Sequence, residues 1–257
     1  MKIATFNING IRARLPRLIE WLQREQPDVA CLQELKCADE ALPVGDIEAA
    51  GYGAVWHGQK GFNGVAILAR GATPELRRVG LPGDPDDSHS RYIEADVGGV
   101  VIASLYLPNG NPIGTEKFDY KLRWMERLRD HAAELLTSER SVVMAGDYNV
   151  VAEDRDVWSA ERMAHDALLQ PDTRVAWRKL LFQGWTDALR ALHPREDKLW
   201  TFWDYTAGCW QRDAGFRIDH LLLSPAATDR LVAAGVDKWV RGEEKASDHA
   251  PTWVVLD

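Results

Sequence analysis

Apolar runs of strand length alternate with segments of helical periodicity along most of the chain. The runs predict strands over residues 2–7, 29–33, 64–69, 92–97, 100–106, 141–146, 217–224, 236–240 and 251–256. Apolar residues at helical spacing predict helices over 15–22, 118–137, 177–182, 186–192 and 225–234. The turn Gly98-Gly99 joins two of the strands into a hairpin. Strands outnumber helices, which favours packed sheets whose outer faces are covered by helices.

No repeat, low-complexity tract or linker divides the sequence, and the polar segment 81–90 is a loop within one sheet system. We therefore expect a single α/β domain over residues 1–257. Three cysteines are too few for a disulfide framework, and no Cys/His spacing is typical of zinc. The N-terminus lacks the apolar segment of a signal peptide, and no apolar stretch is long enough for a membrane span. These features predict a cytoplasmic protein with no membrane partner.

The formal net charge is −8, from 31 Lys+Arg and 39 Asp+Glu. Such an acidic balance argues against a protein that coats nucleic acid or anionic membranes through bulk charge. It leaves room for a local basic groove, and for a site where carboxylates hold a cation.

Polar side chains stand directly at the ends of many predicted strands. They are Asn7, Gln33 with Glu34, Tyr106 with Asn109, Asp147 with Asn149, Asp219, and Asp248 with His249. Each one alone is typical of a turn or a cap. If the strand ends converge, however, four carboxylates share one rim, where they raise one another's pKa unless a cation or a charged histidine offsets them.

Five blocks together carry a family resemblance. They are Gln-Glu-Leu-Lys at 33–36, Tyr-Leu-Pro-Asn at 106–109, Gly-Asp-Tyr-Asn at 146–149, Arg-Ile-Asp at 217–219 and Ser-Asp-His-Ala-Pro at 247–251. In this order, and over essentially the whole chain, the sequence resembles the exonuclease III branch of the AP endonucleases, in the endonuclease/exonuclease/phosphatase superfamily. The resemblance implies a four-layer αββα sandwich of two packed mixed sheets flanked by helices. It also implies a Mg²⁺-dependent DNA repair nuclease, with AP endonuclease, 3′→5′ exonuclease and 3′-phosphatase activities in open proportion.

By the same resemblance, Glu34 is the main metal ligand, with Asn7 and Asp248 nearby. Asp147 matches the residue that activates the attacking water, and Asn149, Tyr106 and Asn109 match positions that contact the phosphate. His249 matches a histidine that stabilises charge on the phosphate, oriented and kept protonated by Asp219, since a carboxylate partner raises a histidine pKa. Mg²⁺ typically takes one or two carboxylates plus waters, and we expect Mn²⁺ to substitute for it.

Two aromatic segments resemble the walls of the pocket that receives a flipped-out abasic sugar and excludes a normal base. One contributes Phe202 and Trp203, and the other contributes Phe216, Arg217 and Ile218. Many relatives carry Trp at the positions of Phe6 and Phe216. We expect a basic rim to contact the backbone of double-stranded DNA, drawn from Lys36, Lys60, Arg91, Lys117, Lys121 and Arg212.

We expect the nuclease to act as a monomer. Two other functions remain as alternatives to a DNA repair nuclease. One is a phosphatase or phosphodiesterase of another superfamily branch, which the Phe202-Trp203 segment and the lack of membrane-binding features disfavour. The other is a non-catalytic nucleic-acid-binding regulator, similar to the catabolite repression control proteins. Such a regulator is expected to lose acidic ligands, whereas Glu34, Asp147 and Asp219 are all present.

Overall fold

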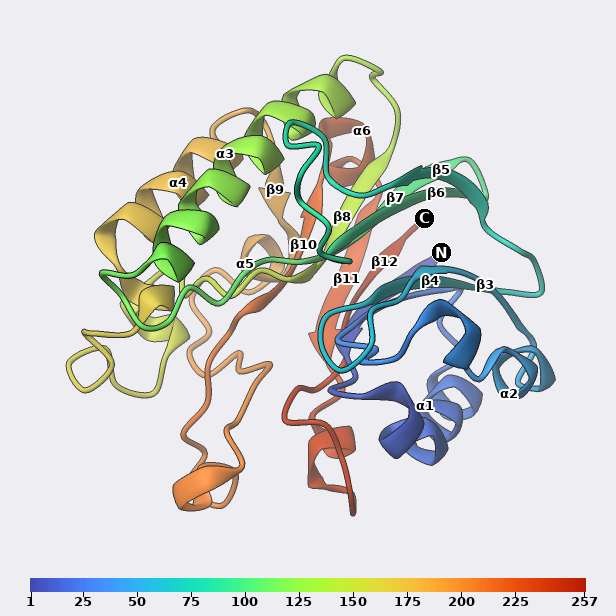
Figure 1. The fold of residues 1–257 in the computed structure, drawn as a ribbon, viewed down its shortest axis with the longest axis horizontal. Coiled ribbons are helices and arrows are strands. Elements are labelled where there is room, and N and C mark those ends of the chain that lie inside the picture. Colours follow the sequence, from blue (N-terminus) through green and yellow to red (C-terminus); the bar gives the residue numbers. More distant parts are fainter.

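The computed structural model describes residues 1–257, in which two six-stranded sheets pack face to face (Figure 1). The first sheet contains β1 (Lys2–Asn7), β2 (Val29–Gln33), β3 (Tyr52–His57), β4 (Val65–Arg70), β11 (Leu231–Val236) and β12 (Thr252–Leu256) in the order β11-β12-β1-β2-β4-β3. The second contains β5 (Glu75–Val79), β6 (Tyr92–Val97), β7 (Val100–Tyr106), β8 (Val142–Asp147), β9 (Thr186–Asp187) and β10 (Asp219–Leu223) in the order β5-β6-β7-β8-β10-β9. The β1–β2 and β7–β8 pairs are parallel and the others antiparallel, so both sheets are mixed.

Helices cover the two outer faces. On one side lie α1 (Ile11–Glu25) and α2 (Val44–Ala49), and on the opposite side lie α3 (Glu116–Leu136) and α4 (Pro171–Leu181) (Figure 1). The helices α5 (Ala188–Leu192) and α6 (Pro225–Thr228) are short, and 3₁₀ turns span Asp39–Ala41, Asp154–Asp156, Ala167–Leu169, Thr206–Gly208 and Lys238–Gly242. No helix combines the length and apolar character needed to cross a membrane. The predicted four-layer αββα sandwich is confirmed.

The continuous apolar runs of the sequence arise because both faces of each sheet are covered. Along β2, Val29 and Cys31 belong to the cluster between the sheets, whereas Ala30 and Leu32 belong to the cluster beneath α1. Side chains alternate between the faces of a strand, so a strand buried on both faces is apolar at every position. A third cluster joins the outer face of the second sheet to α3 and α4.

The strand pairing brings the polar strand ends to one edge of the sandwich. In the parallel pairs, Asn7 lies opposite Gln33 and Tyr106 lies opposite Asp147. The strand β10 runs antiparallel to β8 and begins at Asp219, opposite Asp147. The strands β1, β2, β7 and β8 therefore end at the same edge of the sandwich, and β10 begins there.

The predicted elements are wrong near the C-terminus. The helix predicted over 225–234 stops at Thr228, and residues 231–236 form the edge strand β11. The strand predicted over 236–240 is replaced by a 3₁₀ turn. Pairing with β12 overrides local propensity here, and Gly235 allows the Trp253 ring to pack closely, because a Cβ at that glycine would lie 2.7 Å from the ring. Residues 186–187, predicted as helix, form β9, while α2, β3 and β5 had no predicted counterpart.

Candidate active site

Asp147 lies at the centre of the edge where the strands converge. Its side chain is buried, and one carboxylate oxygen accepts a hydrogen bond from the Asn7 side-chain amide at 3.0 Å. The other oxygen accepts the backbone N–H of Asn149 at 2.9 Å. Burial raises the pKa of Asp147 above its ordinary value of 3.8, and the negative charges of Asp219 and Glu34 raise it further against the opposing charge of His249. The carboxylate is thus fixed in position and more basic than an exposed aspartate.

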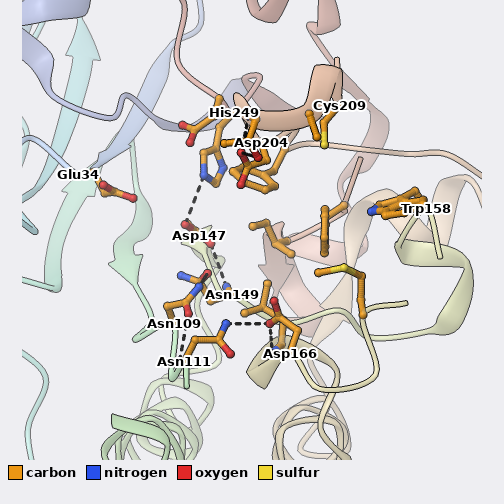
Figure 2. A pocket seen from close by; sticks show the side chains of 18 of the residues that line it. Glu34, Asn109, Asn111, Asp147, Asn149, Trp158, Asp166, Asp204, Cys209 and His249 are labelled. Atoms are coloured by element: carbon orange, nitrogen blue, oxygen red, sulfur yellow. Dashed lines mark hydrogen bonds and ion pairs between the residues drawn. The ribbon is translucent and has the colours of Figure 1, made fainter. Parts of the chain in front are cut away.

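His249 precedes β12 and points toward Asp147. Its Nδ1 lies 2.8 Å from an oxygen of Asp219, and its Nε2 lies 3.8 Å from the Asp147 carboxylate (Figure 2). Burial alone lowers the pKa of an imidazole, but the charges of Asp219, Asp147 and Asp248 outweigh this effect and raise the pKa of His249 well above 6.5. The ring is therefore an imidazolium at neutral pH, with Nδ1 donating to Asp219 and Nε2 facing the cavity.

Glu34 supplies a second carboxylate from just beyond β2. Asn7 donates to one of its oxygens at 2.9 Å, and the Lys36 ammonium lies 2.7 Å from the other. Burial raises the pKa of this carboxyl, but these contacts prevail and hold its pKa below the ordinary value of 4.5. Asp248 accepts a hydrogen bond from Asn9 at 2.9 Å. Polar atoms of Glu34, Asp147 and His249 all lie within 4.8 Å of one another, and because His249 is protonated the two carboxylates are the groups of this set that could hold a cation.

Two asparagines and a tyrosine complete the polar wall. Asn109 donates to the side-chain oxygen of Asn149 at 3.1 Å, and Asn149 donates to the Leu107 carbonyl at 2.9 Å. The Arg91 guanidinium lies 4.7 Å from the centre of the Tyr106 ring. Burial, together with the charges of Glu34 and Asp147, raises the pKa of Tyr106. Its hydroxyl therefore stays protonated and is available as a hydrogen-bond donor.

Backbone strain gathers at this edge. Glu34 and Lys36 have φ values of 54° and 52°, and Asn9 and Asn149 have values of 47° and 49°. The left-handed region suits asparagine but costs other non-glycine residues about 1–2 kcal/mol each. Residues in such conformations cluster at functional sites, where the surrounding structure holds them.

The polar groups open into a cavity of about 470 Å³. Phe202, Phe216 and Ile218 form apolar walls beside Asp147 and His249. The Phe202 ring packs 4.8 Å from the His249 ring and 5.7 Å from Phe216, between centroids. A cluster of charged and polar groups therefore stands beside a wall of aromatic and aliphatic side chains in one cavity.

This geometry agrees with the comparisons to known proteins. A model of the Endonuclease/Exonuclease/phosphatase family matches residues 4–249. The chain belongs to this family. Exodeoxyribonuclease III of Haemophilus influenzae is 34% identical to it over an alignment that covers 98% of each protein. The predicted exonuclease III branch is thereby confirmed.

Solved structures in the family superpose over the entire chain. An AP endonuclease from Archaeoglobus fulgidus has a TM-score of 0.95 and 39% identity, covering 100% of this chain and 99% of that one. A 3′ phosphatase from Neisseria, bound to product DNA hairpin, has a TM-score of 0.96 and 36% identity with the same coverage.

The sequence predictions for the site match the observed placement in most cases. Of the predicted residues, the cavity is lined by Glu34, Tyr106, Asn109, Asp147, Asn149, Phe202, Phe216, Ile218, Asp248 and His249. Asn7, Lys36 and Asp219 stand behind them, in contact with Glu34, Asp147 or His249. Phe6, at a position where many family members have Trp, packs against Trp21 beneath α1 and does not shape the pocket.

Two predicted pocket residues lie elsewhere. Trp203 is fully buried against Trp200, Trp210 and Ala250. Arg217 is fully buried behind the wall, where its guanidinium makes two 2.8 Å contacts to Asp156 and one of 2.7 Å to Asp187. Both residues sit in extended segments next to a residue that faces the cavity, so their own side chains point the opposite way.

Lys121 is not part of the predicted basic rim. It is completely buried, and its ammonium donates to the carbonyls of Pro108, Asn109 and Asn149 at 3.2, 3.1 and 2.6 Å. Burial lowers the pKa of this lysine to about 7. Lys121 therefore ties together the two loops that present Asn109 and Asn149.

Sequence reasoning missed several cavity residues. They are Asn111, Trp158, Met163, Asp166, Leu168, Asp204, Thr206, Ala207 and Cys209. Asn9, the partner of Asp248, was also missed, although it follows Asn7 at the same strand end. In the segment 153–174, no periodic pattern singles out the side chains that turn inward.

Proposed function

We propose that this chain is a Mg²⁺-dependent DNA repair nuclease that hydrolyses phosphodiester bonds at abasic sites and at 3′ ends. The observation that carries the proposal is the chain of contacts from Asp219 through His249 to Asp147 beside the aromatic wall of the cavity. Exodeoxyribonuclease III and the AP endonuclease named above share the chain's full length, and the Neisseria structure holds a DNA product.

The donor set fits a hard divalent cation. Glu34 and Asp248 offer carboxylate oxygens, Asn7 lies between Glu34 and Asp147, and no thiol approaches the cluster. Oxygen ligands of this kind favour Mg²⁺ and admit Mn²⁺. Glu34 would hold the ion, with Asn7 and Asp248 nearby. Such an ion neutralises charge on the phosphoryl oxygens and so lowers the barrier to hydrolysis.

The chain's own residues supply the remaining chemistry. Asp147, held by Asn7 and the Asn149 backbone and made more basic by burial, accepts the proton of the attacking water. His249, kept protonated by Asp219, donates from Nε2 toward the charge that develops on the phosphate. Asn149, Asn109 and the Tyr106 hydroxyl bind the phosphate oxygens.

The apolar walls select the substrate by its shape. Phe202, Phe216 and Ile218 accept an abasic deoxyribose, which lacks the polar edges of a base. Lys36 contacts Glu34 of the cluster, and three other cations of the predicted rim, Lys60, Lys117 and Arg212, are exposed. Contacts of these groups with backbone phosphates explain how an acidic protein binds DNA, and they make binding fall as salt rises.

The whole chain, residues 1–257, acts as one catalytic domain and as a monomer, because both sheets of one chain contribute to the cluster. We place the enzyme in the cytoplasm, where its three free cysteines stay reduced. Elution from a sizing column as a dimer would contradict the monomer.

Incubation with three duplexes tests the proposal: one with an internal abasic site, one with a 3′-phosphate and one with a plain recessed 3′ end. Each is incubated with Mg²⁺, Mn²⁺ or EDTA. We expect metal-dependent products from Asp130→Asn, an exposed control on α3, and none from Glu34→Gln. Absence of product from the unsubstituted enzyme on all three duplexes would refute the nuclease function.

A further inference from the structure

The cavity extends well beyond the hydrolytic cluster. Asp147, Glu34 and His249 occupy one end, and Trp158 stands on the opposite side with Cys209 nearby (Figure 2). Its volume of about 470 Å³ lies within the range of roughly 300–1,000 Å³ that is typical of ligand-binding clefts. A baseless sugar at the cluster would leave the Trp158 end unfilled.

Trp158 presents an anchored aromatic ring with two cations close to it. Its backbone N–H donates to the Gly215 carbonyl at 3.0 Å, and its half-buried ring packs on the cluster that contains Phe216. The guanidinium carbons of Arg162 and Arg212 lie 5.5 and 5.7 Å from the ring centre.

Arg212 is itself held in place. It donates to the Ala207 carbonyl at 3.1 Å and approaches the Cys209 sulfur at 3.7 Å. These contacts orient the Arg212 guanidinium, and because both partners are neutral they do not compensate its positive charge. An indole flanked by guanidinium groups is the surface on which proteins stack nucleobases, because both planes are polarisable and both suit a π-face.

We propose that the Trp158 end of the cavity is a nucleobase subsite, which receives the base of the 3′-terminal nucleotide during exonucleolytic removal. The inference rests on the proposed nuclease function and adds a second recognition element to it. The sugar and phosphate of that nucleotide occupy the end near His249, and the base reaches across to Trp158. An abasic site and a 3′-phosphate both lack a base at this point, so the subsite serves only the third substrate.

A matched pair of duplexes isolates the base. Both have a recessed 3′ end; one ends in an ordinary nucleotide, and the other ends in the same nucleotide with hydrogen in place of the base. The quantity measured is the ratio of kcat/KM for removal of the two terminal units. Because one enzyme preparation acts on both, a partly unfolded variant changes both rates equally and leaves the ratio intact.

We expect Trp158→Ala to lower this ratio about 10-fold, the loss typical of one base–aromatic stack. Trp158→Phe, which keeps an aromatic face, should recover most of the ratio. Phe182→Ala removes an aromatic side chain that is 85% exposed at the end of α4, and it should leave the ratio unchanged.

An unchanged ratio in Trp158→Ala would overturn the subsite. An equal fall in both rates would also overturn it and would indicate that Trp158 supports the DNA or the fold instead. Failure of the unsubstituted enzyme to remove either terminal unit, with Mg²⁺ present, would overturn the exonuclease activity that the subsite serves, and failure on the abasic-site and 3′-phosphate duplexes as well would overturn the nuclease function itself; both results are distinct from those above. Quenching of Trp158 fluorescence, taken as the difference between wild type and Trp158→Phe, should occur with a nucleoside monophosphate and not with deoxyribose 5-phosphate.

Discussion

Lys121→Met removes the one side chain that joins the loops carrying Asn109 and Asn149. The lysine makes three hydrogen bonds to backbone carbonyls from a fully buried position. Hydrogen bonds from a charged donor contribute about 1.5–3 kcal/mol each, or about 4–9 kcal/mol together. Burial outweighs the nearby charges of Asp147 and Asp166 and lowers the lysine pKa from 10.5 to about 7, so the surroundings disfavour the charged form by about 5 kcal/mol net. Because this cost offsets much of the hydrogen bonding, methionine should lower the free energy of unfolding by no more than about 2 kcal/mol.

The effect on catalysis should be larger than the effect on stability. Without a donor between them, the converging carbonyls repel one another, and the 3.1 Å bond between Asn109 and Asn149 is lost. A displacement of about 1 Å in a substrate-positioning group costs about 100-fold in rate. We expect kcat/KM for incision at an abasic site to fall by that factor while the protein remains folded.

Urea unfolding and steady-state kinetics on the same preparations test this expectation. Arg123→Met removes an exposed charge from the same helix and serves as the control, with both quantities near wild type. Lys121→Arg keeps donors at the site and should recover part of the activity. If Lys121→Met were destabilised yet kept kcat/KM within a few-fold of wild type, the lysine would not position the asparagines.

Three further predictions concern the charged groups. Asp147→Asn should lower single-turnover cleavage about 10²–10⁴-fold with little change in DNA affinity; near-normal turnover would remove Asp147 from proton transfer. Asp219→Asn removes a charge that raises the pKa of His249, so the alkaline limb of the kcat–pH profile should move to lower pH, and an unmoved limb would contradict this role. The pKa of Asp187 is lowered, with Arg217 outweighing burial, so this pair stabilises the fold above about pH 4 and the contribution is lost in acid. The deficit of Arg217→Met in unfolding free energy should therefore stay constant from pH 7 to about 4 and shrink as the pH falls below about 4, and a deficit that does not shrink in acid would refute the pairing.

The cluster around Asp147 could be predicted from the sequence because its residues stand at the ends of strands that the apolar pattern already indicates. Asn7 and Asp147 each end an apolar strand, and parallel neighbours necessarily end at the same edge of a sheet. The helices α1 and α3 were also predicted, because each carries a stripe of apolar residues at helical spacing. By contrast, β11 forms only through its pairing with β12, and its exposed Val232 and small residues carry little strand signal of their own.

The predicted placements of Arg217 and Lys121 were wrong because the direction of each side chain was not considered, although the sequence pattern indicates it. In an extended chain, Phe216 and Ile218 face one side, so Arg217 between them must face the other. Lys121 lies three residues before Trp124 and seven before Leu128, which places it on the buried stripe of α3. Its three carbonyl partners, in contrast, belong to loops whose approach only the folded structure reveals.

The packing of the two sheets is itself part of the active site. Asn7 of the first sheet donates to Asp147 of the second, and His249, which leads into the first, pairs with Asp219 of the second. Both bonds cross the sandwich at its edge, and the Gln33 amide continues the series inward by donating to Ser104 at 3.1 Å. These polar contacts fix the register of sheets that otherwise meet through apolar side chains, whose attraction is non-directional. The cost of gathering four carboxylates at one edge, two of them buried, is therefore offset in part by the hydrogen bonds and the charged histidine that hold Asp147 and Asp219 in place.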